Sequence, residues 1–247
     1  PWGAQDGLAD CGCPAGGGTK VKVMLVHQNF PGQFRGLAPA LQETGHDVRA
    51  LSVRKESVIA GVHHVSYQPE RSSSPQIHPW LLNTETAIIR GEAAAERVQR
   101  QAQEGWTPDV VLGHTGWGEM LFMRQVLPHA RLLGFNEMYY RVQGGDVGFD
   151  PEFPVQDVGD ACRVRIKNVN QEMHFSLACA GLSPTQWQAS TFPQPFRDRI
   201  TVVHDGIDTA AIAPQPDCSL TLNGSLRLER GDEIITFVNR QLEPYRG

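Results

Sequence analysis

The fold is decided by residues 21–34, VKVMLVHQNFPGQF. Residues 21–26 are almost continuously apolar, which is typical of a strand buried on both faces of a parallel sheet. The turn that follows contains a single glycine, whereas a dinucleotide-binding turn at this position has the pattern Gly-x-Gly-x-x-Gly. The stretch therefore predicts a strand, a turn and a helix of an α/β protein, and it argues against a nicotinamide-dependent oxidoreductase.

Composition excludes several other classes of protein. The chain has 247 residues, of which 40% are hydrophobic and 20% are charged, as in ordinary globular domains. A net charge of -5 without a run of Lys or Arg argues against a nucleic-acid partner. The apolar runs are too short for a transmembrane segment, although peripheral contact with a membrane stays open. Five cysteines without metal-site spacing predict reduced thiols in a cytoplasmic protein.

Strand-like and helix-like patterns alternate along most of the chain. After the first strand, apolar strand-like segments occupy residues 47–53, 62–67, 108–114, 130–135, 179–183 and 199–204. Helical patterns lie between them at residues 34–41, 80–104, 119–127, 159–178 and 185–192. This alternation predicts an α/β fold with a doubly wound, Rossmann-like parallel sheet. A loop over residues 136–154 is longer than ordinary connections and is a candidate functional element.

The sequence divides into four segments. Residues 1–20 are rich in glycine and small side chains and are expected to form a flexible leader. Residues 21–208 are the Rossmann-like domain, and residues 209–231 have the composition of an interdomain linker. Residues 232–247 are expected to start a second domain that is truncated, because a lone strand cannot bury itself.

Four stretches, in the same order, resemble one family. They are VMLVHQNFPGQFRGLAPALQETGHDV at residues 23–48, PDVVLGHTGWGEMLFM at 108–123, VVHDGIDT at 202–209 and ITFVNRQLEPYRG at 235–247. Together they resemble retaining glycosyltransferases of the GT-B fold, of the family-four type. The resemblance implies the amino-terminal half of a GT-B fold and transfer of a hexose from a nucleoside-diphosphate sugar to a hydroxyl acceptor. It also implies that the transfer reaction needs no metal ion or other cofactor.

The first turn and the second motif supply most of the candidate site residues. In the turn, Gly32 would let backbone N–H groups approach a ligand oxygen, and Asn29 and Gln33 can bind sugar hydroxyls. The alternative is a tight turn that binds nothing. His114 ends a predicted strand, where ligands of open α/β sheets bind, and the resemblance implies that it contacts the donor sugar. Gly116 beside it permits close approach of the backbone.

Two carboxylates and two cations complete the candidates, with their alternatives. Glu119 either caps the next helix or faces the ligand. Glu137 opens the long loop and offers an acceptor to sugar hydroxyls, while Tyr139 and Tyr140 either bind the acceptor or anchor the loop. By resemblance, Arg240 and Arg246 bind the donor diphosphate, although the family commonly has lysine at the second position.

The rival to an enzyme is a noncatalytic module that binds carbohydrate or a protein. Because preorganised leaving-group stabilisation requires a packed domain around its cations, we expect these 247 residues alone to release little or no nucleotide.

Overall fold

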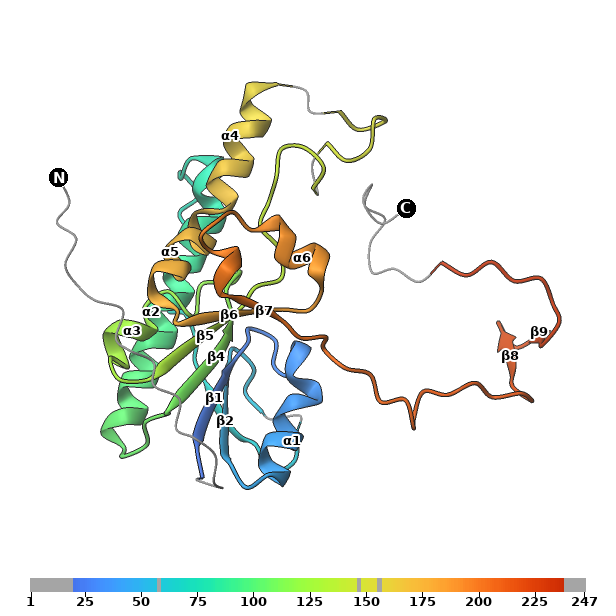
Figure 1. Cartoon of the computed structure of the whole chain (residues 1–247), viewed down its shortest axis with the longest axis horizontal. Helices are drawn as coiled ribbons and strands as arrows, with labels where there is room; N and C mark the ends of the chain where they lie inside the picture. Colours follow the sequence, from blue (N-terminus) through green and yellow to red (C-terminus); the bar gives the residue numbers. More distant parts are fainter. Residues whose placement is uncertain (1–19, 57–58, 146–147, 155–156, 238–247) are drawn as a thin grey trace. The chain divides into compact units, whose positions relative to one another are not determined.

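The computed structural model describes residues 20–56, 59–145, 148–154 and 157–237. Contacts divide the chain into two units, Pro1–Asp205 and Gly206–Gly247. The first unit contains a seven-stranded sheet with helices packed against it (Figure 1). The second contains a two-stranded sheet.

Every pair of neighbouring strands in the large sheet is parallel. Their order is β3-β2-β1-β4-β5-β6-β7, so the chain winds outward from β1 in one direction and from β4 in the other. This arrangement confirms the doubly wound, Rossmann-like fold. The strands are β1 (Lys22–Val26), β2 (Asp47–Ser52), β3 (His63–Ser66), β4 (Val110–His114), β5 (Arg131–Phe135), β6 (Ala180–Ser183) and β7 (Ile200–Val202).

Helices connect the strands and cover both faces of the sheet. They are η1 (Gly32–Arg35), α1 (Leu37–Glu43), η2 (Pro79–Leu81), α2 (Leu82–Gln103), α3 (Met123–Val126), α4 (Val158–Lys167), α5 (Val169–Leu177), α6 (Gln186–Thr191) and η3 (Arg197–Arg199). Figure 1 shows α1 on one side of the sheet and α2 and α3 on the other. In the part of the chain that the structure describes, no helix has the length and apolar character of a membrane span.

The apolar run of β1 is explained by burial on both faces. Val23 and Leu25 pack in one core cluster with Phe34 and Ala38 from η1 and α1. Met24 and Val26 pack in the other cluster with residues of α2 and α3. Successive side chains of a strand point to opposite faces, so a central strand covered on both sides needs apolar residues at every position.

Two helices differ from the sequence prediction. The helix expected at residues 119–127 is reduced to α3, because the chain first turns at Gly118, which has φ +107 and packs against the backbone of Ala87 in α2. The helix expected at residues 159–178 is divided at Asn168. There the side chain of Asn168 exchanges two hydrogen bonds, both 2.9 Å, with the backbone of Tyr140 in the long loop.

The second unit contains a hairpin that the sequence analysis did not predict. β8 (Ser219–Leu222) and β9 (Leu226–Glu229) pair antiparallel within the segment interpreted as a linker. Asn223 and Gly224 turn the chain with φ 50 and 72, and an Asn-Gly pair is a recognised hairpin signal. The strand expected after Asp232 is absent from residues 232–237, and residues 238–247 lie outside the described part. The predicted domain boundaries stay predictions.

Candidate active site

Two histidines meet where the winding direction of the sheet reverses. His27 follows β1 directly, and His114 is the last residue of β4, the strand that pairs with β1. Their rings are 5.6 Å apart between centroids and cross at 78°. Both residues are buried, with 7% and 4% of their surface exposed. Ligands of open α/β sheets bind at this position, beyond the carboxyl ends of the strands on either side of the switch point.

Both histidines are held in the same way by their own strand-end turns. The backbone N–H of Asn29 donates to Nδ1 of His27 at 3.0 Å, and the backbone N–H of Gly116 donates to Nδ1 of His114 at 3.0 Å. A ring nitrogen that accepts a hydrogen bond carries no proton, so each histidine bears its proton on Nε2. His114 directs that nitrogen to Oε2 of Glu137, 3.0 Å away.

A glycine lies against each ring. A Cβ on Gly32 would be 2.4 Å from Nε2 of His27, and one on Gly116 would be 2.9 Å from Cε1 of His114. Gly32 also has φ +46, a region that disfavours side chains. The glycines were predicted to let the backbone approach a ligand. In the structure both glycines lie against the histidine rings, and approach of their backbone to a ligand stays a prediction.

Aromatic side chains surround the pair. Trp117 stacks on His114 at 5.3 Å with 28° between the planes, and Phe135 lies 5.8 Å from it. Phe34 meets the edge of His27 at 6.1 Å. Burial, helped by the neighbouring His114, lowers the pKa of His27 to about 4, so His27 is neutral at physiological pH. Trp117 remains 38% exposed and offers an aromatic face to a ligand.

Carboxylates lie on the solvent side of this pair. The side chain of Glu137 is 47% exposed, and its position after β5 is fixed by Asn136, whose backbone is bonded to Leu182 and Ser183 of β6. Asp205 is close enough for Glu137 to raise its pKa, although burial is the larger cause of that increase. The site therefore combines neutral imidazole, carboxylate and indole groups, a set that suits sugar hydroxyls and the CH faces of sugar rings.

A comparison with models of protein families matches residues 44–212 to the glycosyl transferase family 4 group, and this match covers more than half of the chain. The chain belongs to the glycosyl transferase family 4 group. The resemblance inferred from the four sequence motifs is thus confirmed at the level of the family.

Several solved structures are similar to this family member at low sequence identity. One is a UDP-N-acetylglucosamine 2-epimerase, with 16% identity, a TM-score of 0.48 and coverage of 74% of this chain and 48% of that one. Another is the catalytic domain of starch synthase IV from Arabidopsis thaliana, with 14% identity, a TM-score of 0.44 and coverage of 78% of this chain and 53% of that one. A third is sucrose-phosphate synthase from Thermosynechococcus elongatus, with 14% identity, a TM-score of 0.45 and coverage of 77% of this chain and 92% of that one.

The chain spans about half the length of the first solved structures that it matches. A search of curated proteins found no match.

Within this glycosyltransferase-family domain, Glu119 lies in the interior. It is 1% exposed and accepts a hydrogen bond of 2.5 Å from the hydroxyl of Tyr67, in the core cluster under α2. Burial raises the pKa of the Glu119 carboxyl, and the hydrogen bond from Tyr67 opposes that change. The expectation that Glu119 caps the next helix is wrong, since Phe122 occupies the N-cap of α3 without a side-chain bond. Direct contact with a ligand stays a prediction that its burial does not favour.

The remaining candidates have different positions. Asn29 is exposed and supplies its backbone N–H to His27, and Gln33 lies close enough to His27 to raise the pKa of the ring. Arg240 and Arg246 lie outside the described residues. Among the residues that the structure describes, no group of three or more His, Cys, Asp or Glu side chains is arranged to hold a metal ion.

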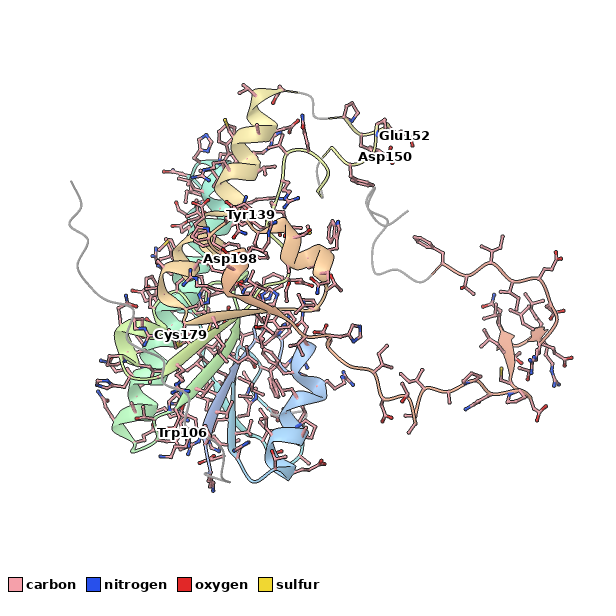
Figure 2. The ribbon with its side chains drawn as sticks, viewed as in Figure 1. Trp106, Tyr139, Asp150, Glu152, Cys179 and Asp198 are labelled. Carbon is pink, nitrogen blue, oxygen red and sulfur yellow. The ribbon has the colours of Figure 1, made fainter. Side chains whose placement is uncertain are left out.

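The two tyrosines of the long loop anchor it. The Tyr139 hydroxyl donates to Glu172 of α5 at 2.6 Å, and its ring lies 5.7 Å from that of Phe192. Figure 2 shows Tyr139 next to α6, at the base of α4. Burial, together with Glu172, raises the pKa of Tyr139 to about 12. These contacts support the anchoring alternative for Tyr139.

The sequence analysis missed His27, Trp117 and Asp205 as members of the site. The rule that selected His114, a polar residue at the end of a buried strand, applies equally to His27. Trp117 and Asp205 occur inside the recognised motifs, but no pattern in the sequence places either beside His114 or Glu137.

Proposed function

We propose that this chain forms the acceptor-side half of a GT-B glycosyltransferase that moves a hexose from a nucleoside-diphosphate sugar to a hydroxyl acceptor with retention. The observation that carries the proposal is the buried His27 and His114 pair at the switch point, with Glu137 bonded to His114, in a member of the glycosyl transferase family 4 group.

In this proposal, the Nε2–H of His114 donates to a hydroxyl of the donor sugar, and Glu137 accepts from a neighbouring hydroxyl. Their own 3.0 Å hydrogen bond keeps both groups oriented when no sugar is bound. His27 stays neutral at physiological pH, which avoids a second positive charge beside an oxocarbenium-like centre. Trp117 packs on the CH face of a sugar ring.

In a retaining transfer the protein mainly has to stabilise the negative charge of the departing diphosphate, and it does not have to supply a strong base. We propose that Arg240 and Arg246 meet that demand once a packed nucleotide-sugar domain surrounds them. These 247 residues alone should therefore release little nucleotide. The test is nucleotide release from UDP-, GDP- and ADP-sugars: sustained release above a heat-killed control contradicts this expectation.

The role of the site is tested in a protein that carries both GT-B halves. Glu137→Gln keeps the shape of the side chain and removes its charge, and we expect it to lower kcat/KM about tenfold or more, as losing a charge-assisted hydrogen bond does. His129→Gln is the control, because His129 is exposed on the turn after α3.

His114→Ala should lower turnover more strongly, by about 100-fold. Since His114 packs on Trp117 and Phe135, this variant also loses stability, and its activity is compared per folded molecule. Unchanged activity per folded molecule in both variants would show that this pair of residues is only structural. Carbohydrate binding without turnover in the protein with both halves would favour the noncatalytic module.

A further inference from the structure

A separate cavity of about 430 Å³ lies between the loop that follows β3 and the first turns of α2. Small-molecule sites have volumes of roughly 300–1,000 Å³, so this one can hold a group of the size of a phosphorylated sugar. The loop around Arg71 forms one wall, and the residues of α2 up to Arg90 form the other. We refer to it as the β3–α2 cavity.

Two arginines are the charged groups that line the β3–α2 cavity. Two guanidinium groups, of Arg71 and Arg90, line it together with the hydroxyls of Ser72, Ser73 and Thr86. The Thr86 hydroxyl donates to the carbonyl of Leu82 at 2.8 Å and accepts from the Ser73 hydroxyl at 2.8 Å, so the arginines are the main donors that face a ligand. No carboxylate lines it among the described residues. The nearby Glu85 is turned to the backbone N–H of Ser74, at 2.9 Å.

Neither arginine forms an ion pair in the part of the chain that the structure describes, although Arg90 is close enough to the buried Glu119 to act against the rise in the pKa of that carboxyl. Arg90 uses Nη1 for a neutral partner, Oε1 of Gln28 at 3.0 Å, which leaves its other donors available. The cavity also lies at the first turns of α2, a helix of 22 residues whose N-terminus adds partial positive charge.

We propose that the β3–α2 cavity binds a phosphate group of the acceptor. The two guanidinium forks match the oxygens of a phosphate, whereas sites for neutral sugars also need aromatic faces. The hydrogen bond between Arg90 and Gln28 links the cavity to the residue next to His27 in the first turn. A phosphate held there would position the rest of the acceptor toward the two histidines. Phosphate binding itself stands on the cavity alone, while its assignment to the acceptor rests on the proposed function.

The direct test is calorimetric titration of the 247-residue chain, at low salt, with inorganic phosphate, glucose 6-phosphate and glucose. We expect the first two to bind and glucose to bind weakly or not at all, with affinity falling as salt is raised. Arg71→Gln should weaken phosphate binding about tenfold or more, the effect of losing one charge-assisted contact.

Arg71 is exposed and forms no hydrogen bond or ion pair with the described residues, so this variant should fold normally. The matched control is Arg100→Gln, which makes the same charge change near the far end of α2, away from the cavity, where Arg100 pairs weakly with Glu96 at 4.0 Å.

A second arm identifies the source of the phosphate. Phosphatidylcholine vesicles that contain phosphatidic acid are compared with vesicles of phosphatidylcholine alone. Binding to the former that Arg71→Gln weakens indicates a lipid-borne phosphate. Binding of glucose 6-phosphate without vesicle binding indicates a soluble acceptor. Both results support the cavity as a phosphate site.

The proposal is overturned if phosphate and glucose 6-phosphate fail to bind, or if Arg71→Gln and Arg100→Gln weaken binding equally. If Arg71→Gln loses phosphate binding but a protein with both halves transfers no sugar, the phosphate site stands and the proposed function is refuted. Transfer to acceptors with a KM that Arg71→Gln leaves unchanged would refute the acceptor role and keep the proposed function.

Discussion

Replacing Gly32 by alanine tests how rigidly His27 is held in the site. The new Cβ would lie 2.4 Å from Nε2 of His27 and within 2.7 Å of two further ring atoms. The residue would also keep φ +46, which glycine adopts freely and alanine does not. Two separate effects therefore oppose this substitution.

Their magnitudes follow from the structure. A left-handed backbone conformation costs a non-glycine residue about 1–2 kcal/mol. Crowding a packed ring costs about 1–3 kcal/mol more, because His27 is buried between Phe34 and His114 and has little room to move. We expect Gly32→Ala to lower the free energy of unfolding by about 2–5 kcal/mol.

Gly45→Ala is the matched control, since Gly45 has φ +87 but no atom within 4 Å of a Cβ. It should cost only the backbone contribution, about 1–2 kcal/mol. When His27 is already replaced by alanine, the loss of unfolding free energy caused by Gly32→Ala should fall to that same value. The difference between the two backgrounds gives a coupling energy of about 1–3 kcal/mol between the two positions.

Equilibrium urea unfolding followed by tryptophan fluorescence measures these differences. Trp80, Trp106, Trp117 and Trp187 lie in the described part of the first unit, so their signal reports on its unfolding. If Gly32→Ala costs no more than Gly45→Ala, or if the cost is the same with and without the His27 ring, then the ring is not pressed against this turn.

Other predictions concern buried polar groups. Burial lowers the pKa of His27 and of His174 to about 4 from an ordinary 6.5, so the unfolded chain takes up protons first and stability should fall as pH drops from about 6.5 to about 4. His174→Leu should make that fall shallower in urea unfolding at several pH values, and an unchanged slope would show that His174 does not contribute. Tyr67→Phe should lower the free energy of unfolding by about 1–3 kcal/mol, because Glu119 loses its donor in the core. Tyr67→Phe combined with Glu119→Leu should recover part of that loss, and an equal or larger loss in the double variant would contradict the pairing.

The sequence determined the sheet and one side of the site. Continuous apolar strands such as β1 are stable only when covered on both faces, and their alternation with helices leaves parallel pairing as the solution. His114 was found because a strand end is a position that local sequence reveals. The first three family motifs indicated the fold for the same reason, since each contains the end of a strand and the turn that follows it.

The tertiary structure decided which residues meet. His27 and His114 are neighbours because β4 pairs with β1, a choice of strand order that depends on long-range packing and not on either segment. Glu119 and Tyr67, 52 positions apart, form a buried pair that neither local pattern indicates. Gly32 shows a similar limit. The sequence predicted a turn there, but only the structure shows that the ring of His27, at the end of β1, folds back and fills the space that a Cβ on Gly32 would need. Local pattern specifies periodicity and turn chemistry, whereas contacts between distant residues are set by how whole elements pack together.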